Sequence, residues 1–107
     1  MIPFKEEIEN IKEQIISIYS PNKIILFGSC ASGCAKKDSD IDLCIICDYE
    51  DKKKLLNELL INLEYSRDVD FVLYKPSEWD KYKEDTSSFA NIINRKGVPI
   101  YGWHFEI

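Results

Sequence analysis

The sequence has no long apolar run and no surplus of positive charge. Its apolar segments, such as IDLCIIC, are far shorter than the roughly 20 residues that a helix needs to cross a bilayer. The 14 Lys and Arg residues against 19 Asp and Glu residues give a formal net charge of −5. Phosphate contacts need clustered cations, so this balance disfavours a protein that binds the nucleic-acid backbone. We therefore expect neither a membrane protein nor direct nucleic-acid binding.

An apolar leader is missing as well. The first stretch, MIPFKEEIENIKEQ, is charged within its first few residues and has no apolar core, so we expect no signal peptide. The chain is then expected in the cytoplasm, with its four cysteines reduced. The 107 residues contain no repeat, linker or low-complexity tract, and 45% are hydrophobic. One domain covering residues 1–107 is therefore expected.

Histidine is scarce, and the only one lies in an aromatic tail. His104 belongs to the final stretch YGWHFEI, where it is expected to pack or to be exposed rather than to act in catalysis. The aromatic residues of this tail either close the core or mark an interface with a partner or a second copy.

The apolar pattern predicts the order helix, strand, strand, helix, strand, helix, helix, strand. Two consecutive strands break strict alternation, so a mixed sheet is expected. Pro76-Ser77 opens the third predicted helix, with Ser77 as a candidate N-cap, and Gly97 caps the fourth. The predicted helices cover residues 4–20, 51–65, a segment from 76 and 88–96, and the strands cover 23–27, 40–47, 69–74 and 98–101.

Three aspartates lie where neighbouring strands are expected to begin. Asp40 and Asp42 are separated by one residue at the start of DIDLCIIC, so alternation puts both side chains on one face. Asp70 lies near the start of the next strand, and the intervening helix favours a parallel pairing. Parallel neighbours begin at the same sheet edge, so we expect the three carboxylates to converge there. Such close charges repel unless a cation separates them, and these ligands suit Mg²⁺.

A Gly-Ser pair ends the first predicted strand, KIILF. If that strand runs antiparallel to the second, Gly28 and Ser29 reach the edge that carries the aspartates. Glycine lets a phosphate approach the backbone, and free N–H groups and the Ser29 hydroxyl can bind phosphate oxygens. The sequence therefore predicts a phosphate-binding turn opposite a two-metal carboxylate cluster, which suits phosphoryl or nucleotidyl transfer.

Each of these residues also has a plainer interpretation. Asp40 and Asp42 could be a solvated strand start, and Ser29 could be only a turn residue. Asp68 lies on the same face as Asp70 and competes with it for the third position. We prefer Asp70 because the apolar run FVLY follows it directly.

The cysteines offer a rival metal site with zinc-like spacing. Cys44 and Cys47 form a C-x-x-C motif, but it falls within a predicted strand. An odd separation in a strand points the two side chains to opposite faces, so they cannot share one metal without distortion. Cys30 and Cys34 do not complete a second motif of that spacing. We therefore interpret the cysteines as small apolar fillers.

The stretch GSCASGCAKKDSDID contains Gly-Ser, ten residues and then Asp-x-Asp. This pattern resembles the signature of the DNA polymerase beta-type nucleotidyltransferase superfamily. Within that superfamily, the chain most resembles the minimal nucleotidyltransferase (MNT) domain proteins, through ILFGS, SDIDL, VDFV and INRKGVPIYG. The resemblance implies a small two-layer α+β domain similar to the polymerase beta palm, with a mixed sheet and helices packed on one face.

The resemblance also implies roles for the residues of the motif. In the family, the paired aspartates hold Mg²⁺ with a nucleoside triphosphate, and the third aspartate binds metal and activates the acceptor hydroxyl. These roles carry over to Asp40, Asp42 and Asp70, and the Gly-Ser role carries over to Gly28 and Ser29. Two Mg²⁺ ions, with ATP or another nucleoside triphosphate as substrate, are therefore expected.

For MNT proteins, the resemblance further implies a partner, a helical HEPN-domain toxin. The MNT protein acts there as antitoxin and transfers AMP from ATP to a tyrosine of the toxin. The chain ends soon after its last predicted strand, so we expect another protein or subunit to supply the acceptor site. A homodimer or hetero-oligomer would provide it.

The sequence departs from the family in the loop after Gly-Ser. Cys30 and Ser32 occupy positions where relatives often carry arginine. Lys36 and Lys37 can supply part of that charge, as point charges rather than planar forks, although both could equally be solvated loop residues. The loss of the arginines supports a second hypothesis, a catalytically weak module that neutralises a helical partner by contact. A third, less favoured hypothesis is a small-molecule nucleotidyltransferase.

Overall fold

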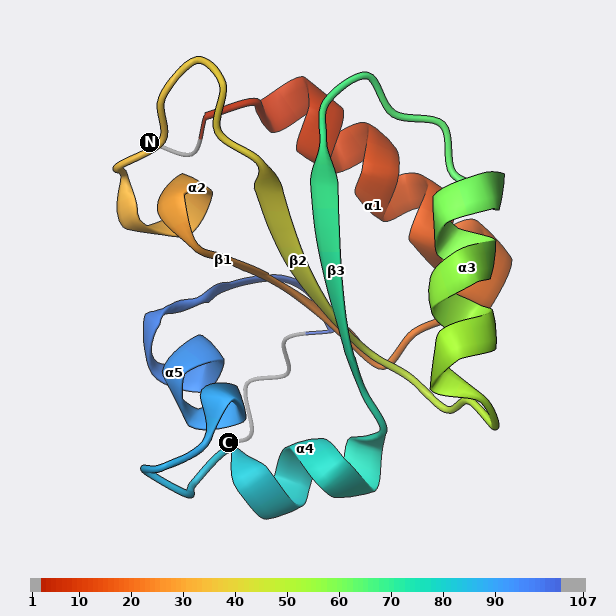
Figure 1. Cartoon of the computed structure of the whole chain (residues 1–107), viewed down its shortest axis with the longest axis vertical. Helices are drawn as coiled ribbons and strands as arrows, with labels where there is room; N and C mark the ends of the chain where they lie inside the picture. Colours follow the sequence, from red (N-terminus) through yellow and green to blue (C-terminus); the bar gives the residue numbers. More distant parts are fainter. Residues whose placement is uncertain (1–2, 103–107) are drawn as a thin grey trace.

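The computed structural model describes residues 3–102, which form a four-stranded sheet and its helices (Figure 1). The predicted order of elements is confirmed, with one extra helical turn after the first strand. Along the described chain the elements are α1 (Lys5–Tyr19), β1 (Lys23–Phe27), α2 (Ser29–Ser32), β2 (Ile41–Ile46), α3 (Lys52–Asn62), β3 (Val69–Tyr74), α4 (Pro76–Tyr82), α5 (Phe89–Lys96) and β4 (Val98–Tyr101).

The sheet is mixed, as predicted, with the strand order β3-β2-β1-β4. β1 runs antiparallel to both β2 and β4, whereas β2 and β3 are parallel and joined through α3. The hairpin-like β1–β2 connection and the β2–α3–β3 crossover bring the end of β1 and the starts of β2 and β3 to one edge of the sheet. The small α+β class with a mixed sheet is thus confirmed.

Helices cover both faces of this sheet, so the expectation of helices on one face is wrong. Ile24 and Leu26 of β1 belong to a core cluster that also contains buried residues of α1 and α3. Ile25, between them, belongs to a second cluster with Trp79 of α4 and Ile93 of α5. The stretches IILF in β1 and LCII in β2 are apolar at consecutive positions, which is typical of strands that are buried on both faces.

The helix ends follow local capping chemistry. The Asp51 side chain accepts a hydrogen bond from the Lys54 N–H and starts α3, and the Ser88 side chain starts α5 in the same way. The residue that caps α4 is Lys75, whose N–H donates to the Glu78 side chain at 2.9 Å. The prediction of Ser77 as that cap is wrong because Pro76 already takes the first helical position.

Two apolar residues of the helices are exposed. Leu60 of α3 is half exposed, and α3 ends at Asn62, short of the predicted residue 65. Ile18, near the end of α1, is also half exposed. His104 and the aromatic tail around it lie outside the described residues. None of the helices between residues 3 and 102 is both long and apolar enough to cross a membrane.

Candidate active site

Two of the predicted aspartates are direct neighbours across the parallel strands. Asp42 of β2 is in register with Asp70 of β3, and Phe27, the last residue of β1, is in register with Asp42. The adjacent residues Ile41 and Leu43 are buried in the cluster with α1 and α3. Strand alternation therefore turns Asp42 to the α4 and α5 face, where Cys44 packs. The same alternation places Asp70 on that face, and its side chain is exposed.

The Asp42 carboxyl group is electrostatically perturbed. Its burial, the charges of Asp70 and Asp40, and a side-chain hydrogen bond with Asp70 raise the pKa of Asp42 to about 6. The Asp42 carboxyl group therefore keeps its proton to a higher pH than an isolated aspartate does. A divalent cation bound to the two oxygens would replace that proton and remove the repulsion.

Gly28 packs directly against the Asp42 carboxylate. It has φ 73° and ψ −154°, a backbone conformation that L side chains rarely adopt. A Cβ atom on this glycine would overlap Oδ2 of Asp42. Ser29 follows as the first residue of α2, and the Gly28 carbonyl accepts hydrogen bonds from the N–H groups of Ala31 and Ser32 at 3.1 Å. The structure thus brings the Gly-Ser turn and the Asp42–Asp70 pair together, as the sequence predicts.

Asp40 lies to the side of that pair. It comes immediately before β2, its side chain is exposed, and its carbonyl accepts a hydrogen bond from the Cys30 thiol at 3.5 Å. Its charge acts on Asp42, but residues 3–102 contain no group of three or more His, Cys, Asp or Glu side chains close enough to hold a metal ion. The carboxylate oxygens of Asp42 and Asp70 suit a hard divalent cation. The Asp40 carboxylate lies nearby but does not form a three-carboxylate group with them.

Asp68, the rival of Asp70, has a different environment. Its backbone carbonyl accepts the Ile41 N–H at 2.9 Å and begins the parallel pairing, and its exposed side chain lines a pocket that Asp42 and Asp70 do not line. Asp70, by contrast, is in register with Asp42, and its charge contributes to the raised pKa of that residue. The geometry therefore favours Asp70 for the third position.

The two loop lysines differ in their surroundings. Both Lys36 and Lys37 are exposed. Lys37 lines the pocket that also contains Asp40 and Asp68, and Gly28 does not line that pocket. Both lysines are on the same loop as Asp40, where they add positive charge near the carboxylates.

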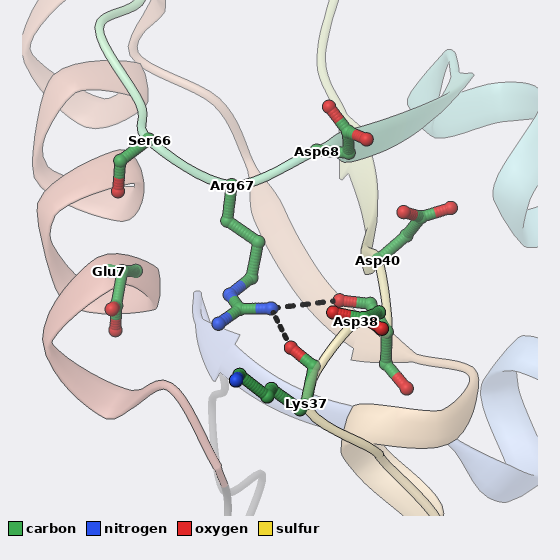
Figure 2. A pocket seen from close by; sticks show the side chains of 8 residues that line it. Glu7, Lys37, Asp38, Asp40, Ser66, Arg67 and Asp68 are labelled. Carbon is green, nitrogen blue, oxygen red and sulfur yellow. Dashed lines mark hydrogen bonds between the residues drawn. The ribbon is translucent and has the colours of Figure 1, made fainter.

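Arg67 is a residue of this region that the sequence analysis did not single out. It lines the same pocket, and its Nη1 donates hydrogen bonds to the backbone carbonyls of Lys37 at 2.8 Å and Ser39 at 3.3 Å. Figure 2 shows the guanidinium reaching from the turn before β3 to the loop before β2. The chain has only two arginines, and that rarity is the one signal in the sequence that could have drawn attention to it.

The cysteines do not form a metal site. Cys44 is buried in the cluster with α4 and α5, whereas Cys47 is buried in the cluster with α1 and α3, so the predicted opposite orientation is confirmed. Burial raises the pKa of Cys44 to about 12 and also raises the pKa values of Cys30 and Cys47. Cys34 alone among the four is exposed.

This difference in burial predicts a simple labelling result. In the folded protein, a thiol reagent should modify Cys34 rapidly and the other three cysteines only after unfolding, because thiolates are the reactive species and burial suppresses them. Mass spectrometry with and without denaturant would measure this. Rapid modification of Cys44 under native conditions would show that the strand is not buried as described.

A comparison with family models gives a match that covers most of the chain. The nucleotidyltransferase domain model matches residues 8–93, which run from α1 to α5 and include the Gly-Ser turn and both members of the Asp42–Asp70 pair. No match was found among curated proteins. The fold, the sheet edge and the family model agree, and the chain belongs to the nucleotidyltransferase domain family.

Proposed function

We propose that this protein transfers AMP from ATP to a tyrosine hydroxyl of a helical HEPN-type partner and so acts as an antitoxin. Membership of the nucleotidyltransferase domain family supports a nucleotidyltransferase activity. The observation that carries the proposal is the close approach of Gly28 to the Asp42 carboxylate, beside the in-register Asp70. The acceptor and the partner rest on the resemblance to MNT proteins.

In this proposal the carboxylates would hold two Mg²⁺ ions together with the nucleotide. Asp42 and Asp70 would supply the principal oxygen ligands, and Asp40, in the adjoining loop, would supply a further one. The bound metal would offset the negative charge that develops at the α-phosphate. The raised pKa of Asp42 supports a metal ion at this site. It reflects burial and the repulsion between closely spaced carboxylates, and a bound cation would relieve that repulsion.

The chain's own groups have separate tasks. The backbone around Gly28 and the Ser29 hydroxyl bind phosphate oxygens, and Lys36 and Lys37 add positive charge. Asp70 is exposed, so an acceptor can approach it from outside the domain. The oxygen of the acceptor hydroxyl bonds to the α-phosphorus while the bond from that phosphorus to pyrophosphate breaks. Asp70 accepts the proton that this hydroxyl loses.

Labelled ATP provides the test of this function. The protein is incubated with labelled ATP, Mg²⁺ and the helical protein encoded beside it, and both chains are then analysed by mass spectrometry. The expected result is a mass increase of one or more AMP groups on a tyrosine of the partner, dependent on Mg²⁺. Unmodified partner under conditions where the two proteins form a complex would overturn the transfer.

A second candidate is a partner-binding module with little or no catalysis. The observation that favours it is the loop after Gly28, where Cys30 is buried and Ser32 carries no charge, although relatives often have arginine at both positions. Calorimetry separates the two candidates. A module of this kind would bind its partner tightly, would not bind Mg-ATP, and would keep its partner affinity when Asp42 is replaced by asparagine.

A further inference from the structure

The side chain of Arg67 joins three segments that are far apart in the sequence. Its Nη1 donates hydrogen bonds to the carbonyls of Lys37 and Ser39, at 2.8 and 3.3 Å, in the loop before β2 (Figure 2). Its Cζ lies 3.5 Å from the centroid of the Phe4 ring, at the start of α1. Arg67 itself belongs to the turn before β3. A planar guanidinium can donate to carbonyls and stack on a ring at the same time, which an ammonium cannot do.

Phe4 occupies a strained backbone conformation beneath this guanidinium. Its φ of 56° and ψ of 37° are in the left-handed region, which is unusual for a bulky residue and costs about 1 to 3 kcal/mol. Its carbonyl accepts the Ile8 N–H at 2.9 Å and so begins α1. Its ring packs against the buried cluster of α1 and α3 as well as on Arg67. Surrounding contacts therefore hold the strained residue in place.

The loop that Arg67 binds ends at Asp40. Ser39, one of the two acceptors, is the residue before Asp40, and the pocket that Arg67 lines includes the Asp40 side chain (Figure 2). Along the chain, Arg67 comes three residues before Asp70. A backbone hydrogen bond from the Ile41 N–H to the Asp68 carbonyl, at 2.9 Å, joins the start of β2 to the residue before β3.

We propose that Arg67 is a positioning residue, which fixes the loop before β2 so that Asp40 stays close enough to the Asp42–Asp70 pair to join it when a metal ion binds. This inference rests on the proposed function, because it assumes that the loop held by Arg67 belongs to a metal site. Arg67 does not touch the metal or the nucleotide in this account. It acts through the carbonyls of Lys37 and Ser39 on the backbone that precedes Asp40. Residues that orient metal ligands without touching the metal usually contribute about 10- to 100-fold to metal affinity.

Metal binding and thermal stability, measured separately, test the inference. Mn²⁺ serves as the probe because it takes the same oxygen ligands as Mg²⁺, and electron paramagnetic resonance measures its affinity for the full chain. The Arg67→Met variant should bind Mn²⁺ about tenfold more weakly than the wild type. The Arg67→Lys variant should fall between them, because lysine keeps the charge but cannot bond both carbonyls while stacking on the ring.

The Phe4→Leu variant is the matched control. It removes the ring beneath the guanidinium but keeps both bonds to the loop carbonyls, so it should lower the melting temperature with less than a threefold change in Mn²⁺ affinity. A purely structural role for Arg67 predicts that metal affinity follows stability across all three variants, and that result would overturn the inference. If the folded Arg67→Met protein binds Mn²⁺ as the wild type does, the inference fails while the proposed function stands. If the wild type does not bind Mn²⁺, both fail.

Discussion

Replacing Asp42 by asparagine is expected to abolish nucleotidyl transfer and, at the same time, to stabilise the metal-free protein. The carboxylate is a principal metal ligand in the proposed mechanism, and an amide in its place removes the negative charge that holds the cation. The same charge is unfavourable without metal, because the side chain is half-buried and lies beside Asp70 and Asp40.

The sign of the stability effect follows from the raised pKa of Asp42. The pKa rises from 3.8, the ordinary value that the unfolded chain retains, to about 6 in the folded protein. Between these two values the folded protein binds more protons than the unfolded chain, so the free energy of unfolding falls as the pH rises from about 4 to 6. Above pH 6 the whole cost is present. Because Asp42 is only half-buried, solvent screening reduces it to about 1 kcal/mol.

The Asp42→Asn variant should therefore melt roughly 4 °C above the wild type at pH 7 without metal, and this difference should vanish near pH 4. Scanning calorimetry at both pH values with a chelator measures the stability, and labelled ATP measures transfer. Asp68→Asn is the matched control: it removes a nearby exposed charge and should leave transfer unchanged. Full transfer activity in Asp42→Asn would rule out the mechanism.

Replacing Gly28 by alanine is expected to damage both the fold and the site. The backbone of Gly28 has a conformation close to glycine-only, and the new Cβ would overlap Oδ2 of Asp42. We expect a loss of about 2 to 4 kcal/mol in the free energy of unfolding. The displaced Asp42 carboxylate should lower the rate of transfer on the order of 100-fold, since a misplaced group costs about that much.

Gly33 provides the control for this variant. It also has a positive φ, 82°, but a Cβ there meets no atom within 4 Å. Gly33→Ala should therefore cost only about 1 kcal/mol, from backbone strain, and should leave transfer within a few-fold of the wild type. Denaturant unfolding and the labelled transfer assay measure both variants. Equal losses in Gly28→Ala and Gly33→Ala would show that the contact with Asp42 does not matter.

Strand alternation and connection rules made the centre of the site predictable. Asp42 and Asp70 meet because a parallel pair joined by a helix begins at one edge, and Gly28 reaches them because β1 is antiparallel to β2. Alternation also separated Cys44 from Cys47. Each of these inferences depends on local spacing and on backbone direction, which a sequence expresses directly.

The features that were missed depend on contacts between distant segments. Helices lie on both faces of the sheet because α4 and α5 pack on the face opposite α1 and α3. The unbroken apolar run IILF already indicated a strand that is buried on both faces. The position of Asp40 beside the pair, rather than within a closed group, depends on the path of an irregular loop. Arg67 makes all its known contacts with segments about 30 or more residues away, and no spacing rule expresses those.

The most direct test of the central claim is calorimetric binding of Mg-ATP to the wild type and to the Asp42→Asn and Asp70→Asn variants. If the edge formed by Asp42, Asp70 and the Gly28–Ser29 turn is the nucleotide site, the wild type binds Mg-ATP and each variant binds at least tenfold more weakly, while Asp68→Asn binds normally. Unchanged Mg-ATP affinity in both the Asp42→Asn and Asp70→Asn variants would contradict the account.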